Sequence, residues 1–421
     1  MARSSLAFAL EPNGPPPYVP DVADNTAAHP SSQAALREAN RRRVLTCLQA
    51  AGAMTQVELA RATSLSPATI SNIVRELDGA GLLHVSPTVS SGRRARAVTV
   101  NPRAGIAAGI DFGRRHVRVV VADLAHEVLG EHEELLAAHL PADEAISLAL
   151  ALLDGLLAEL GLERTALVGV GAGLPGPVDG RTGEVGASSV LPEWVGLVPA
   201  AALGARLGVP VTVDNDANLG VLAEARWGAA QGEDNVVYLK VSSGIGAGLL
   251  LGGQLYRGQS GTAGEIGHTT IDENGVVCRC GSRGCLETVA SVPVILELLR
   301  HSYGDITIEQ VLAQARQGDT GCRRVIEDVG RHIGAAVANM CNLLNPGLVV
   351  VGGALAPAAD LLLDPIRYAV RRYAIPTASA TRVVVSALGP RATALGALAI
   401  GLRSAQLALP SAASGPQPFV D

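Results

Sequence analysis

The pattern of apolar and polar positions differs between the beginning of the chain and the rest. From Ser31, apolar residues at helical spacing predict a helix whose apolar stripe contains Leu36, Val44, Leu45 and Leu48. Beyond Ala104, short apolar runs predict buried strands, and an amphipathic helix is predicted over residues 142–160. A hinge between the two parts is predicted at residues 101–104.

Two further helices are predicted before the hinge, and both carry start signals. Thr55 and Glu58 have the spacing of a capping box, in which each side chain caps the backbone N–H of the other residue. Ser66 is placed to cap the next helix, with Pro67 at its first position. The buried face of this third helix is predicted to contain Ile70, Ile73, Val74 and Leu77. The order helix, tight turn, helix is typical of a helix-turn-helix DNA-binding domain.

The segment after Gly81 resembles the wing of a winged helix-turn-helix, because two strand-like runs flank a Ser-Gly-Arg-Arg tip. Short polar side chains near the start of the third helix suit base edges in a major groove, and wing arginines suit phosphates or the minor groove. The candidate DNA-binding residues are Thr69, Ser71, Asn72, Arg75, Arg93, Arg94 and Arg96. The alternative is a winged helix that contacts only protein and whose charges form a solvated face.

Charge is unevenly divided along the chain. Between Ala35 and Ala104 ten arginines face four acidic residues, so this segment has a net charge of +6 while the remainder carries −12. A basic segment on an acidic body points to a polyanion as the partner of that segment alone. The expected partner is operator DNA, and paired half-sites would require a homodimer or a homotetramer.

Cysteine usage and the N-terminus bear on location. The six cysteines show no disulfide framework, which suits a reducing compartment, and Cys47, Cys322 and Cys341 are predicted to be packing residues. The first residues have a short apolar stretch followed at once by Pro and Gly, which predicts a disordered leader and not a signal peptide. No apolar run is long enough to predict a membrane span. The expected location is the cytoplasm, with nucleoid association when DNA is bound.

Four residues have the spacing of a metal site, H-x9-C-x-C-x4-C: His268, Cys278, Cys280 and Cys285. Nitrogen and sulfur ligands in this number predict a closed tetrahedral Zn2+ site, and Gly281 and Gly284 permit the sharp turns that it needs. Because no coordination position is left for water, the zinc is expected to be structural. The alternative is a set of unrelated buried thiols and a surface histidine, but the polar neighbours Arg279, Ser282 and Arg283 do not fit a core.

The runs Val241–His268 and Cys278–Glu287 resemble the signature and the zinc loop of the ROK family (repressor, open reading frame, kinase). The resemblance extends from about Ala107 to the C-terminal helix. It implies an α/β fold of the actin-like ATPase (ribonuclease H-like) type with two lobes. With the DNA-binding segment in front, the chain resembles a ROK transcriptional regulator.

The organisation expected from these features has four parts. Residues 1–32 form a disordered leader, and residues 33–102 form the winged helix-turn-helix domain. Residues 103–404 form the two-lobed ROK sugar-binding domain, with the zinc loop at 268–285. Residues 405–421 form a disordered tail.

The resemblance identifies a degenerate nucleotide site. Asp111 would help to hold Mg2+, Gly113 would approach a phosphate, and the second phosphate loop and the adenosine turn would contain Gly244, Gly246 and Gly353. Sugar kinases of the family carry a second glycine and a threonine directly after the first glycine, whereas this chain has Arg114 and Arg115. Bulky residues there block the close backbone approach that a phosphate requires, which argues against ATP and Mg2+.

The resemblance also implies a set of sugar-binding residues: Asn215, Asp216, Glu265, His268 and Glu287. In the family's kinases the aspartate that matches Asp216 is the general base for the accepting hydroxyl. His268 would serve both the metal and the ligand. Asn218 has an alternative role as an Asx cap for a helix that begins near Leu219.

Two main functions follow. The first is a sugar-responsive transcriptional regulator, a repressor of carbohydrate metabolism genes, with a sugar or phosphosugar as effector. The second is an active ATP-dependent sugar kinase that carries a DNA-binding domain, with Asp216 as its catalytic residue. Arg114 and Arg115 favour the regulator, whereas Asp216 and the second phosphate loop favour the kinase. A third possibility is a zinc scaffold with neither role.

Overall fold

The structure is a computed structural model that describes residues 33–90, 93–136, 140–186 and 190–408. The predicted leader and the tail from residue 409 onward lie outside these residues. The chain divides between Asn101 and Pro102 into two compact units, each of which is considered separately below. Among the described residues no helix is both long and apolar enough to cross a membrane.

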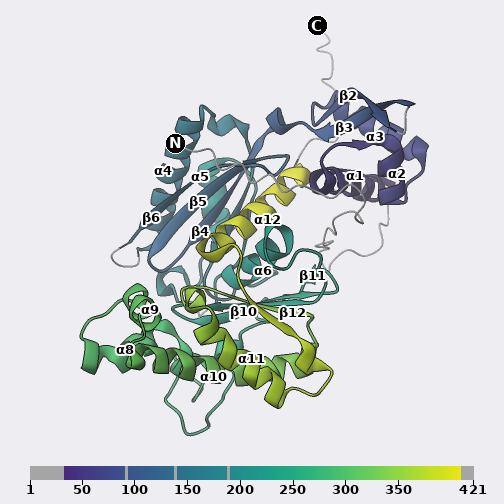
Figure 1. The fold of residues 1–421 in the computed structure, drawn as a ribbon. Coiled ribbons are helices and arrows are strands. Elements are labelled where there is room, and N and C mark those ends of the chain that lie inside the picture. Colours follow the sequence, from purple (N-terminus) through teal and green to yellow (C-terminus); the bar gives the residue numbers. More distant parts are fainter. Residues whose placement is uncertain (1–32, 91–92, 137–139, 187–189, 409–421) are drawn as a thin grey trace. The chain divides into compact units, whose positions relative to one another are not determined.

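The first unit is a three-helix bundle with a small antiparallel sheet (Figure 1). Its elements are α1 (Gln33–Ala51), β1 (Met54–Thr55), α2 (Gln56–Thr63), α3 (Pro67–Gly79), β2 (Leu83–Ser90) and β3 (Arg93–Val100). The strands lie in the order β1-β3-β2. Val44, Leu48, Leu59, Ile70 and Val74 form much of its core, because the apolar stripes of all three helices face inward.

The start signals of α2 and α3 are confirmed. Thr55 N–H donates to Glu58 Oε2 at 2.7 Å and Thr55 Oγ1 accepts from Glu58 N–H at 3.3 Å, which completes the capping box. Ser66 Oγ accepts from Thr69 N–H at 3.1 Å. The predicted place of Leu36 in the buried stripe is wrong, because its side chain is 50% exposed. Leu36 lies in the first turn of α1, before the part of that helix that packs on α2 and α3.

The second unit begins with a five-stranded sheet in the order β6-β5-β4-β7-β8. Its strands are β4 (Ile106–Phe112), β5 (His116–Asp123), β6 (Val128–Leu135), β7 (Leu167–Leu174) and β8 (Val211–Asn215). Strands β4, β5 and β6 are antiparallel neighbours, whereas β7 and β8 run parallel to β4. The helices α4 (Ala142–Leu160) and α5 (Pro199–Leu207) pack on this sheet through Leu153, Leu157 and Leu203.

The second sheet of this unit repeats the same arrangement in the order β11-β10-β9-β12-β13. Its strands are β9 (Val236–Val241), β10 (Ile245–Leu251), β11 (Gln254–Leu255), β12 (Leu348–Gly352) and β13 (Arg382–Val385). The helices that accompany it are α7 (Glu287–Ala290), α8 (Val292–Tyr303), α9 (Ile308–Arg316), α10 (Thr320–Leu344) and α11 (Asp360–Tyr373). The two lobes therefore share one strand order, as the actin-like interpretation predicts.

Two helices lie between the sheets (Figure 1). Helix α12 (Ala392–Ala408) packs on β4 and β7, α6 (Asp216–Trp227) packs on β9 and β10, and the two helices pack on each other. Small residues allow this: a Cβ on Gly109 would lie 2.2 Å from Ala394 O, and one on Gly396 would lie 2.0 Å from Leu219 O. The N-terminal ends of both helices consequently lie at the gap between the lobes, where the site is found.

Candidate functional site

The four predicted metal ligands lie together. Their ligand atoms are all within 4.8 Å of one another. Cys278 Sγ lies 3.5 Å from His268 Nδ1, and Cys280 Sγ lies 3.7 Å from Cys285 Sγ. A tetrahedron around zinc, with bonds of about 2.0–2.3 Å, has edges of roughly 3.3–3.8 Å. The donor set therefore fits a metal ion of this kind.

Backbone geometry brings the cysteines to one point. Gly281 and Gly284 have φ values of 88° and 62°, in the left-handed region that glycine adopts without strain. A Cβ on Gly284 would lie 1.6 Å from Asp272 O, so the loop cannot close with a larger residue there. The two glycines noted in the sequence are thus part of the site.

Arg279, which stands between two of the cysteines, connects the loop to Glu287. Its Nε and Nη2 lie 3.0 and 3.1 Å from Oε1 and Oε2 of Glu287. Glu287 Oε2 also accepts from Ile245 N–H at 3.2 Å. The carboxylate is 8% exposed and is held on both sides. Sequence analysis placed Glu287 in the sugar site but did not find this arginine as its partner.

Three predicted carboxylates are close enough to influence one another. Burial raises the pKa of Glu265 to about 7, and the negative charges of Asp216 and Glu287 act in the same direction. Glu265 Oε2 lies 3.9 Å from His268 Nε2, the ring nitrogen on the side away from Cys278. His268 can thus contact the metal through Nδ1 and the acidic side of the cleft through Nε2.

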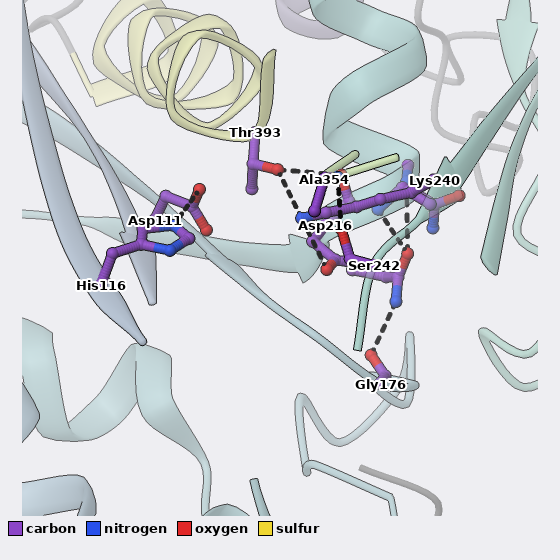
Figure 2. Close-up of polar contacts among 11 residues, drawn as sticks. Asp111, His116, Gly176, Asp216, Lys240, Ser242, Ala354 and Thr393 are labelled. Carbon is purple, nitrogen blue, oxygen red and sulfur yellow. Dashed lines mark hydrogen bonds and ion pairs between the residues drawn. The ribbon is translucent and has the colours of Figure 1, made fainter. Parts of the chain in front are cut away.

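The N-terminus of α6 differs from the prediction. The helix begins at Asp216, not near Leu219, and its cap is Asn215. Asn215 Oδ1 accepts from Ala217 N–H at 2.8 Å, and Nδ2 donates to Gly176 O at 2.9 Å (Figure 2). Asn218, the residue proposed as an Asx cap, is instead buried and donates to Asp214 Oδ1 at 2.9 Å. Asn215 was preferred as the cap because it stands directly before the first helical residue.

Lys240 is a site residue that sequence analysis missed. Its Nζ lies 2.8 Å from Asp216 Oδ2 and donates to Thr393 Oγ1 of α12 at 3.1 Å (Figure 2). Burial alone would lower the pKa of Lys240, but the carboxylates of Asp216 and Asp111 outweigh burial and raise this pKa above its usual range. The lysine is therefore charged and holds Asp216 as a carboxylate. A single lysine in the otherwise apolar strand β9 was the signal for it.

The predicted nucleotide residues are occupied by other parts of the chain. His116 Nε2 lies 3.0 Å from Asp111 Oδ2, and its ring covers Gly113, where a Cβ would lie 2.1 Å from His116 Cε1. In the second phosphate loop, a Cβ on Gly244 would lie 2.6 Å from Glu287 Oε2, whereas Gly246 has free space around it. Gly353 has a φ of 86° and lies against β9, where a Cβ would be 2.4 Å from Val241 O.

In the first unit, α3 presents the predicted polar face. Asn72 and Arg75 are exposed, Thr69 and Ser71 are partly exposed, and the four predicted apolar positions are buried. Arg96 on β3 is exposed, while the side chains of Arg93 and Arg94 lie outside the described part of the chain. The arginines of α1 have internal partners: Arg41 pairs with Glu76, and Arg43 donates to Thr63 O at 3.2 Å.

Comparison with known proteins is consistent with both units. Residues 107–404 match the ROK family, and residues 38–94 match the MarR family. A putative xylose repressor of Caldicellulosiruptor sp. is 29% identical, over 90% of this chain and 99% of that protein. The N-acetylglucosamine repressor of Escherichia coli O157:H7 is 32% identical, over 84% of this chain and 89% of that protein. The crystal structure of a ROK family transcriptional regulator, a homologue of E. coli Mlc, has a TM-score of 0.77 at 29% identity and covers 89% of this chain and 98% of its own.

Proposed function

Because the chain belongs to the ROK family and begins with a MarR-type winged helix, we propose that it is a sugar-responsive transcriptional repressor of carbohydrate metabolism genes. The observation that carries the proposal is the combination of an exposed polar face on α3 with an acidic, zinc-clamped cleft in one chain. The first feature suits DNA and the second suits a polyhydroxylated ligand.

The DNA-binding residues are proposed from α3 and the wing. Thr69, Ser71, Asn72 and Arg75 would face base edges, and Arg93, Arg94 and Arg96 would contact phosphates or the minor groove. Burial of the four apolar residues on the other face of α3 fixes which side is free. A homodimer or homotetramer would present two such helices to a paired operator.

The sugar-binding residues are proposed from the gap between the lobes. Asn215, Asp216, Glu265, His268 and Glu287 would offer hydrogen-bond acceptors and donors to the hydroxyl groups of a sugar. A site built of polar groups rejects ligands that lack the matching hydroxyls, because its own groups would then remain unpaired. A carbohydrate is therefore the class of effector that this cleft suits best.

We propose Zn2+ as the metal held by His268 and the three cysteines. The ion would supply no chemistry, because four protein ligands leave no open coordination position. Its contribution is to fix the loop. The loop in turn fixes Arg279 between two ligands, and Arg279 orients Glu287.

Sugar binding would act on DNA binding by favouring one arrangement of the two lobes. A ligand shifts such an equilibrium only as far as it binds one arrangement better than the other. If the favoured arrangement changes the spacing of the two winged helices in a dimer, operator affinity changes with it.

The test is operator binding across a panel of sugars. DNA fragments selected by the purified protein from a random library would be titrated by fluorescence anisotropy without sugar and with xylose, N-acetylglucosamine and glucose. We expect at least one sugar to change the operator Kd by about fivefold or more. An unchanged Kd with every sugar, in a protein that still binds the DNA, would refute the proposal.

Two variants separate the halves of this test. Asn72→Ala should weaken DNA binding while leaving the sugar-induced rise in Tm intact, because α3 is remote in sequence from the cleft residues. Asp216→Asn should leave DNA binding intact and reduce the response to sugar. A loss of both activities in either variant would indicate a folding defect instead.

A further inference from the structure

The nucleotide half of the gap contains three interactions in which the chain satisfies its own groups. The first is the pair of Asp111 and His116, whose ring also covers Gly113 (Figure 2). Asp111 is only 2% exposed, so its carboxylate cannot turn toward water without losing this partner. The ATP and Mg2+ that the fold family implies would need both this carboxylate and the space over Gly113.

The second interaction is the ion pair of Lys240 and Asp216. Lys240 Nζ is also held by Thr393 Oγ1, which itself lies 3.5 Å from the carbonyl oxygen of Asp216 (Figure 2). The lysine is thus fixed from β9, α6 and α12 at once. A buried ammonium at this point provides the positive charge that a bound metal ion would otherwise bring to the two aspartates.

The third interaction closes the turn after β12. Ser242 Oγ accepts from Ala354 N–H at 2.9 Å, and Gly353 packs directly on Val241 (Figure 2). A backbone N–H that could donate to a phosphate oxygen is therefore already paired. The residues present do not fit ATP with Mg2+, and no step of phosphoryl transfer is derived for this protein.

The cations that contact the carboxylates of the cleft are committed as well. Lys240 is paired with Asp216, Arg279 with Glu287, and Arg257 with Asp214, to which its Nη2 lies at 2.8 Å. Glu265 adds a further carboxyl group without a cation of its own within 4 Å other than His268. A phosphate brought next to Asp216 would meet carboxylates before it met a free cation.

We propose that Lys240 is the internal cation of this site, which makes the cleft a receptor for an uncharged sugar that excludes both ATP with Mg2+ and phosphosugars. Lys240 is a positioning residue: it holds Asp216 ionised and oriented, so that the carboxylate accepts hydrogen bonds from sugar hydroxyls and does not serve as a base. This inference rests on the proposed function and specifies the chemical class of its effector.

The first test needs no variant. Glucose, N-acetylglucosamine and mannose, each beside its 6-phosphate, and ATP with Mg2+ would be titrated into the zinc-loaded full-length protein by calorimetry. We expect one neutral sugar to bind at least about tenfold more tightly than its phosphate, and ATP with Mg2+ to give no heat. Equal or tighter binding of the phosphosugar, or saturable binding of ATP with Mg2+, would overturn the inference and leave the proposed function standing. If no sugar or phosphosugar binds, the proposed function itself fails.

The second test is a double-mutant cycle on the best-binding sugar. Lys240→Met should weaken that sugar by about tenfold in the parent but by less than about threefold in the Asp216→Asn background, where no charge needs a partner. Lys240→Arg, which keeps the charge, should retain the preference for the neutral sugar. An equal loss from Lys240→Met in both backgrounds would show that the lysine does not act through Asp216, and would refute its role.

Discussion

At the scale of single residues, the pair of Asp111 and His116 has a charge state that changes within the range of ordinary buffers. Burial would raise the pKa of Asp111, but His116 lowers it below its usual value. Burial would likewise lower the pKa of His116, but Asp111 raises it. The raised pKa of His116 means stability that is fully present below the pKa of an unfolded histidine and lost as pH rises through the folded value. The lowered pKa of Asp111 means stability lost only in acid.

His116→Ala should therefore destabilise the protein most at mildly acidic pH. Near pH 5.5, where both partners are charged, we expect a loss of about 1–3 kcal/mol, because a buried carboxylate loses its partner. The loss should shrink toward pH 8.5, as His116 becomes neutral in the parent. Urea unfolding at both pH values measures the difference. His132→Ala is the control, since His132 and Glu159 form a pair at the surface; an equal pH effect in both variants would contradict the assignment.

The sequence predicted some residues of the site and not others, for a physical reason. Ligands with short separations are visible, because His268 and the three cysteines must converge through the turns of one loop. Lys240 was not predicted, because its partners Asp216 and Thr393 come from two other helices and meet it only after the sheets have formed. His116 was hidden in the same way, since it reaches back across a hairpin to Asp111. Local spacing cannot show such pairings.

At the scale of elements, the zinc loop is expected to act on the cleft through one side chain. Arg279→Ala should leave zinc content unchanged but weaken sugar binding by about tenfold, because Glu287 loses two charge-assisted hydrogen bonds. Calorimetry and a zinc assay on the same sample measure the two effects. Arg283→Ala is the matched control, since Arg283 lies in the same loop and donates only to Gly275 O. Similar losses in both variants would mean that the loop is merely destabilised.

Helix α6 and the segment after β13 are joined by one buried carboxylate. Glu224 is fully buried and accepts from Ser386 Oγ and from the N–H groups of Ala229 and Leu388. Glu224→Ala should lower the free energy of unfolding by about 3 kcal/mol, because several buried donors are left unpaired. Glu233→Ala, which removes a surface pair with Arg382, should cost less than about 1 kcal/mol in the same urea titration. Equal costs would show that the donors of the first site find water instead.

The success of element prediction followed the clarity of the local signal. Helices α4 and α10 begin and end where their apolar periodicity predicts, because each buries one long face. Strand β6 was not predicted, since its sequence VLGEHEEL is mostly polar and it lies at the edge of its sheet. Helix α11 was hidden by Pro365 inside it. Strand β1 exists only through its pairing with β3.

At the scale of the whole molecule, the two units carry opposite charge. The segment from Ala35 to Ala104 has a net charge of +6, although Arg41 and Arg43 are held by internal partners. The arginines left for a polyanion are those on the exposed side of α3 and on the wing. The remainder of the chain, at −12, would repel DNA and so confine contact to the first unit. Charge alone therefore orients the protein on a duplex.

Coupling between the two ligands must be reciprocal if the protein is a switch. Should a sugar weaken operator binding by some factor, saturating operator must weaken binding of that sugar by the same factor, which for proteins of this kind is about 5–150. We expect Asp216→Asn to lower sugar affinity because it breaks the pair with Lys240, and Asn72→Ala to lower operator affinity because it removes a groove contact. Neither change should alter the ratio between the two conditions, since each acts on a single binding step. Anisotropy with and without sugar, and calorimetry with and without operator, supply the four constants. Factors that differ between the two directions would show that sugar and DNA do not act on one shared equilibrium.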